Sequence, residues 1–213
     1  MRKTLLLAAS AAMVAGFATT AAASTVPDTQ ETGNVVLQGH VPAFCYVAAA
    51  GTPPSGSFGD TVVLDQGTPP SIADTTTGKL LASLSGATSS TAGFNRTYEI
   101  VCTGANNSVT LTATAMNNAS GSAATGYATK VDYTAEADYA VVGGAAVSPI
   151  TQTYVTATSA STGPTTLGAN VRLAVTNPNV TLKFYAFNTP GANDVLEAGT
   201  YTGTITVTIT AGA

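Results

Sequence analysis

The stretch AGTYTGTITVTITAGA, residues 198–213, decides the fold. Bulky residues and threonines alternate along it. One phase holds Tyr201, Gly203, Ile205, Val207 and Ile209. A period of two fits a β-strand and not a helix of 3.6 residues per turn, and β-branched residues suit a pleated backbone. The stretch therefore predicts a strand with one apolar face, which needs a pairing partner because its backbone groups otherwise form an open edge.

A second alternating stretch lies in the N-terminal part of the chain. Residues 33–45 read GNVVLQGHVPAFC, and Pro42 ends the alternation because proline cannot donate to a ladder. Four residues share one face of this candidate strand: Val35, Leu37, Gly39 and Val41. We expect here another strand with a single apolar face.

The same period of two recurs between these stretches. Residues 94–103 place Phe94, Tyr98, Ile100 and Cys102 on one face, and residues 109–115 alternate with threonine. Further candidates lie at 58–64, 127–133, 139–142, 150–158, 171–175 and 180–187. No segment has a convincing helical period, residues 79–84 are of undecided type, and the low-complexity stretch 116–125 predicts a loop. About ten short strands separated by Gly, Pro, Asn and Ser clusters predict an all-β sandwich.

The first residues have the pattern of a secretory signal peptide. Arg2 and Lys3 precede an apolar run at residues 5–17, and Ala21-Ala22-Ala23 fits the small-residue cleavage rule. The apolar run is too short for a membrane-spanning helix. We expect residues 1–23 to be removed, and no membrane span in the mature chain.

The composition excludes several classes of function. Only 8% of residues are charged, and eleven acidic residues outnumber seven basic ones. Nucleic acid is therefore excluded as a natural ligand, and no Lys/Arg cluster exists to hold an anionic membrane. The apolar fraction of 45% is enough for a packed core. With so few acid–base groups, we expect no catalytic site and no cofactor.

The two cysteines, Cys45 and Cys102, are an even number in a chain that we expect to be exported. Oxidising compartments let disulfides persist, so we interpret them as one bridge. Zinc prefers four ligands, and together with His40, the single histidine, the chain offers only three soft ones. We therefore expect no metal site.

The sequence contains three candidates for a functional site. Asp132, Glu136 and Asp138 could hold calcium, but their spacing matches no EF-hand loop, and an acidic turn is the simpler interpretation. His40 lies on the outer phase of its candidate strand, where a solvated side chain is expected. Exposed rings could line a sugar-binding face, formed by Tyr127, Tyr133, Tyr139, Tyr154 and Tyr185.

Taken together, these features resemble the subunits of chaperone-usher pili. The resemblance is carried by the signal peptide, the stretch 33–45, the second cysteine in an inward-facing strand, and Gly199 followed by the alternating residues of the last stretch. The first half is similar to the spore coat protein U-like secreted subunits of the archaic branch. Three short motifs carry this second likeness: CYV at 45–47, SFGD at 57–60 and YEIVC at 98–102.

The resemblance implies an immunoglobulin-like sandwich without its own last strand, whose groove is filled by a neighbour's N-terminal extension. Residues 24–43 would be this extension and residues 44–213 the sandwich domain. The donor strand would present Val35, Leu37, Gly39 and Val41. The groove-edge strand, to which a periplasmic chaperone would bind, would contain Gly199, Tyr201, Ile205, Val207 and Ile209.

The family further implies partners and a location. Identical or homologous subunits would form the polymer, and an outer-membrane usher would assemble it. The protein would pass through the periplasm to an extracellular fibre on the cell surface. The alternative is a self-contained secreted binding module, a lectin or adhesin, whose N-terminal strand folds back onto its own sandwich.

Overall fold

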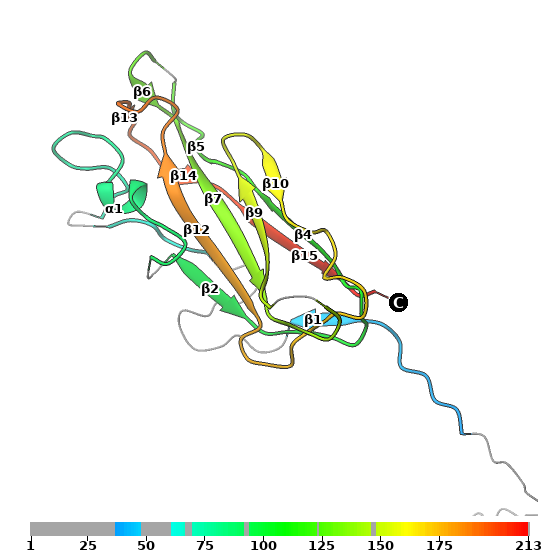
Figure 1. The fold of residues 1–213 in the computed structure, drawn as a ribbon. Helices are drawn as coiled ribbons and strands as arrows, with labels where there is room; N and C mark the ends of the chain where they lie inside the picture. Colours follow the sequence, from blue (N-terminus) through cyan, green and yellow to red (C-terminus); the bar gives the residue numbers. More distant parts are fainter. Residues whose placement is uncertain are drawn as a thin grey trace, which may run out of the picture. The chain divides into compact units, whose positions relative to one another are not determined.

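The computed structural model describes residues 37–47, 61–66, 70–91, 94–122, 124–145 and 148–212. The chain divides into two compact units, Met1–Gly39 and His40–Ala213. All the described helices and strands belong to the second unit (Figure 1). The expected signal peptide and Val35 lie outside the described residues.

The second unit is mostly β-structure with one short helix, α1 (Ala82–Ser85). Its first strands are β1 (Cys45–Val47), β2 (Asn95–Tyr98), β3 (Ile100–Cys102), β4 (Ser108–Ala113) and β5 (Met116–Asn118). The middle strands are β6 (Tyr127–Ala128), β7 (Lys130–Tyr139), β8 (Val141–Val142), β9 (Ile150–Val155) and β10 (Ala160–Thr162). The last strands are β11 (Arg172–Leu173), β12 (Val180–Asn188), β13 (Val195–Leu196), β14 (Tyr201–Thr202) and β15 (Ile205–Thr210).

The largest sheet has the strand order β10-β9-β7-β12-β2, and β5 joins it by pairing with both β7 and β14. All of these pairs are antiparallel. Four two-stranded sheets accompany it: β1-β3, β8-β11 and β4-β15 are antiparallel, and β6-β13 is parallel. In β4-β15, Val207 lies opposite Leu111 and Thr208 opposite Thr110, so the two apolar faces coincide.

The sheets share one hydrophobic core. Val109 and Leu111 of β4 are buried in it together with side chains of β7 and β12. The Gln152 side chain on β9 donates a hydrogen bond of 3.2 Å to the Val109 carbonyl oxygen. The Tyr133 hydroxyl on β7 donates one of 3.2 Å to the Thr204 carbonyl oxygen, next to β15. Both bonds hold the β4-β15 pair against the large sheet.

One buried asparagine replaces backbone pairing where β3 approaches the start of β12. The Asn179 side chain accepts a hydrogen bond from the Ile100 N–H at 2.8 Å and donates bonds of 2.7 Å to the carbonyl oxygens of Ile100 and Ala174. Buried backbone groups must be paired, because an orphaned one costs about 1–3 kcal/mol. Asn179 therefore fixes the position of Ile100, which contributes to the site described below.

The β-rich fold is confirmed, and so are the strands at β4, β12 and β15. Several details differ from expectation. Residues 61–64 form no strand, residues 116–118 belong to β5 and not to a loop, and α1 occupies part of the undecided segment 79–84. The acidic residues at 132–138 lie within the ten-residue strand β7, so the prediction of an acidic turn is wrong.

Candidate functional site

The strand β15 has one unpaired edge. Among the described residues it pairs with β4 alone, so the N–H and C=O groups of its other edge have no ladder. The threonines of β15 are exposed, whereas Ile205, Val207 and Ile209 are half-buried and pack against the core. The strand thus offers a free edge beside a row of incompletely covered aliphatic side chains.

A small hollow lies between β1 and the Ile209 side chain of β15. Its volume is about 90 Å³, and its walls are formed by Cys45, Tyr46, Val47, Ile100 and Ile209. None of these residues is charged. In the part of the chain that the structure describes, β1 pairs only with β3, so the strands on both sides of the hollow have an unpaired edge. This arrangement suits an added apolar strand whose backbone pairs with a free edge and whose side chains fill the hollow.

The disulfide builds the β1 wall of this hollow. Cys45 is bonded to Cys102, which confirms the predicted pairing, and the two residues are also register partners in the β1-β3 ladder. Their Cα atoms are 4.2 Å apart. β1 is only three residues long, and Tyr46 and Val47 are exposed. The covalent bond is therefore a main contribution to holding this wall in place.

The other predicted groove-edge residues lie before β15. Gly199 has φ +151°, and a Cβ there would collide with the Asn118 side chain, so only glycine fits this turn. The Tyr201 hydroxyl lies 2.6 Å from the Ala128 carbonyl oxygen and 2.9 Å from that of Glu197. Gly199 and Tyr201 therefore fix the chain just before β15. The three aliphatic residues of β15 form the apolar face of that strand.

Two of the predicted donor residues have apolar side chains that are exposed to solvent. Leu37 is 91% and Val41 73% exposed, and nothing lies within 4 Å of where a Cβ on Gly39 would be. The described segment 37–44 lies outside every strand. An alternating apolar segment is thus available for pairing.

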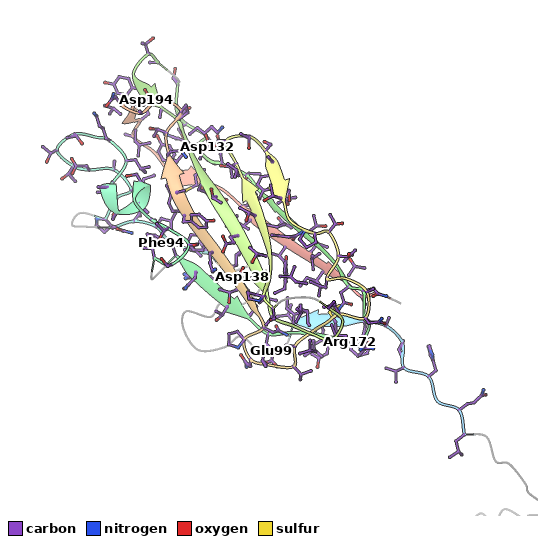
Figure 2. All side chains as sticks on the ribbon, viewed as in Figure 1. Phe94, Glu99, Asp132, Asp138, Arg172 and Asp194 are labelled. Carbon is purple, nitrogen blue, oxygen red and sulfur yellow. A yellow bond between two sulfur atoms is a disulfide. The ribbon has the colours of Figure 1, made fainter. Side chains whose placement is uncertain are left out.

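The acidic residues of β7 are engaged in cross-strand contacts. The Lys183 ammonium on β12 lies 2.8 Å from Glu136 and 2.5 Å from Asp138. The Tyr185 hydroxyl donates a hydrogen bond of 2.7 Å to Glu136, and the Thr151 hydroxyl one of 2.6 Å to Asp138. Asp132 lies near the start of β7, away from Asp138 (Figure 2), and 3.0 Å from the Lys130 ammonium. These carboxylates neutralise lysines on the sheet.

Burial and these contacts shift several pKa values upwards. Burial raises the pKa of Tyr133 and Tyr139 well above the usual range. Burial, reinforced by the hydrogen bond to Glu136, raises the pKa of Tyr185 to about 12. Burial alone would lower the pKa of Lys183, but hydrogen bonds and charges of the two carboxylates outweigh it, and the pKa is raised.

These four groups predict a loss of stability at alkaline pH. Each holds its proton more tightly in the folded than in the unfolded state, so their contribution is complete below the unfolded pKa values, near 10, and is lost as pH rises. We expect the free energy of unfolding to be constant from neutral pH to about pH 10 and to fall steeply by about pH 12. Urea unfolding over a pH series measures it, and a stability that stays level up to pH 12 would contradict the assignment.

The remaining candidates do not come together as a site. Tyr133 and Tyr139 are buried in the core, Tyr154 and Tyr185 are half-buried, and Tyr127 is exposed, so the five tyrosines form no common sugar-binding face. His40 is exposed and lies outside the strands. Within the described ranges, no three His, Cys, Asp or Glu side chains are grouped as metal ligands. No described helix is long and apolar enough to cross a membrane.

Sequence reasoning missed two walls of the hollow. Tyr46 and Val47 follow the first cysteine directly, and Ile100 shares the phase of the second one. The alternation about the cysteines was the available signal, but only the pairing of β1 with β3 brings these residues together.

Comparisons with family models, curated proteins and solved structures give no match for this chain.

Proposed function

We propose that this chain is a structural subunit of an extracellular surface fibre that polymerises by donor-strand exchange. In this proposal the second unit is an incomplete immunoglobulin-like sandwich, and the N-terminal segment of a neighbouring copy pairs with β15. The observation that carries it is the free edge of β15 beside an uncharged hollow. Strand addition of this kind is an established mode of recognition, in which backbone bonds give affinity and alternate side chains give specificity.

The chain also contains a segment suited to that edge. Leu37 and Val41 are exposed, and the intervening Gly39 has the same phase. Burying each large aliphatic side chain contributes about 1.5–3 kcal/mol, and each backbone hydrogen bond adds about 1 kcal/mol. Several such terms acting together fit a slowly dissociating joint between subunits. The low content of charged residues suits close stacking of copies.

The binding-module alternative has less support. It requires the N-terminal strand to complete its own sheet, whereas the described segment 37–44 lies outside the strands. It also requires an exposed binding face, and two of the five candidate rings are buried. During assembly, the periplasmic chaperone implied by the family would bind the same β15 edge, and the outer-membrane usher would assemble the subunits.

The wild-type protein tests the proposal directly. We expect material sheared from the producing cells to contain thin fibres by electron microscopy, and unheated samples to give SDS-resistant ladders that mass spectrometry assigns to this chain. Heating should convert the ladders to monomer, because the joint is not covalent. A purified protein that stays monomeric, with residues 35–41 protected from hydrogen exchange inside its own sheet, would replace the fibre by the binding module.

A further inference from the structure

The segment that leads into β1 is fixed to the end of β3. The Thr103 hydroxyl donates a hydrogen bond of 2.9 Å to the Pro42 carbonyl oxygen and accepts one of 3.0 Å from the Phe44 N–H. The Thr103 N–H donates a further bond of 3.0 Å to the Phe44 carbonyl oxygen. The next residue, Cys45, is held by the disulfide. Residues 42–45 are therefore fixed at the root of the N-terminal segment.

This fixed root has an exposed aromatic surface. The rings of Phe44 and Tyr46 stack with their centroids 5.9 Å apart and their planes inclined by 27°. They remain 42% and 51% exposed. Adjacent exposed aromatic rings are characteristic of contact surfaces, because their burial contributes much free energy while little conformational entropy is lost.

We propose that the Phe44–Tyr46 pair packs against the next copy of this chain and makes the joint between consecutive subunits rigid. The inference rests on the proposed function, because only strand exchange brings that copy to this place. Phe44 follows Val41 by three residues, so even a fully extended chain separates their Cα atoms by at most about 11 Å. With Val41 in the neighbour's groove, the Phe44 ring lies within reach of the neighbour's surface.

A second copy fits this surface better than another partner. The strand-exchange joint would bring the neighbour to the aromatic pair at high local concentration, so even a small contact would form. Without that contact, the subunits would be connected only where the donor strand ends at Val41 and the fixed root begins at Pro42, and the fibre would bend at that point. Thr103 is a positioning residue in this arrangement, since it fixes the direction of the root.

The test compares the bending of fibres made from full-length variants. In Phe44→Ser we expect fibres and SDS-resistant ladders as in the wild type, but a persistence length in electron micrographs that falls severalfold. Phe44 is preferred to Tyr46, which also lines the hollow. Tyr127→Ser is the matched control, because Tyr127 is 52% exposed and lies on β6, at the far end of the sheets from β1 (Figure 1).

A second pair of variants tests the same joint without altering the rings. Thr103→Val removes the hydroxyl contacts and should also shorten the persistence length, whereas Thr103→Ser keeps the hydroxyl and should restore it. Phe44→Ser fibres as stiff as the wild type would overturn the inference. Loss of ladders in Phe44→Ser would also overturn it, because the ring would then serve strand exchange itself. Absence of fibres in the wild type would instead reject the proposed function.

Discussion

The substitution Leu37→Asp is expected to abolish SDS-resistant ladders while the subunit still folds. In the proposed joint, Leu37 enters the apolar groove beside β15, whereas in the isolated chain it is 91% exposed. The change removes about 1.5–3 kcal/mol of apolar burial and adds the cost of desolvating an unpaired carboxylate. A total loss of at least about 4 kcal/mol weakens the joint about a thousandfold. Gel electrophoresis of unheated samples and electron microscopy measure the result.

Two further variants make this test specific. Gln38→Asp adds the same charge one residue later, on the face that would point away from the groove, and should leave the ladders intact. Gly39→Phe should be as damaging as Leu37→Asp if the groove is shallow at that position, although the structure leaves the Gly39 backbone open in the free chain. Ladders that persist in Leu37→Asp, or that disappear equally in Gln38→Asp, would contradict a strand inserted with this face inward.

The sequence predicted strands well where one face is apolar and the other consists of uncharged residues. β4 and β15 have that pattern, and the inward residues Val109 and Leu111 are buried as expected. The sequence of β7 also alternates, with Val131, Tyr133 and Ala135 buried, but its acidic residues suggested a turn because acidic residues are depleted in strands. Glu136 and Asp138 are compensated by Lys183 of β12, and sequence spacing carries no information about that pairing. Asp132 is paired with Lys130 of its own strand.

The candidate site was predictable only in part, for a similar reason. The alternation gave the apolar face of β15 and the inward direction of Cys102, because both are local properties. The hollow depends on how far β1 stands from β15, and the unpaired edge depends on which strands pair elsewhere in the fold. The strand β5, with the sequence Met-Asn-Asn, likewise exists only through its pairing with β7 and β14. Non-local pairings of this kind fix a register that composition cannot supply.

The second large effect is expected for Cys45→Ser/Cys102→Ser. The bridge joins residues 57 positions apart. In the loop-entropy model a bridge of that span stabilises the folded state by about 4 kcal/mol, a large part of the 5–15 kcal/mol typical of a domain. Urea unfolding measures this loss, and introducing both changes into Leu37→Asp keeps the protein monomeric during the measurement.

The same variant should also lose the ability to receive a donor strand. Without the disulfide, β1 is held by three residue pairs with β3 and by the contacts of Thr103, while Tyr46 and Val47 gain little from burial. The β1 wall of the hollow should then separate from β3, and Ile100 and Ile209 would lose their cover. When Leu37 is left unchanged, we therefore expect the double cysteine variant to form no ladders, even at temperatures at which it is still folded. A variant that unfolds with unchanged free energy and still polymerises would show that β1 is held without the bridge and that it does not form the receiving groove.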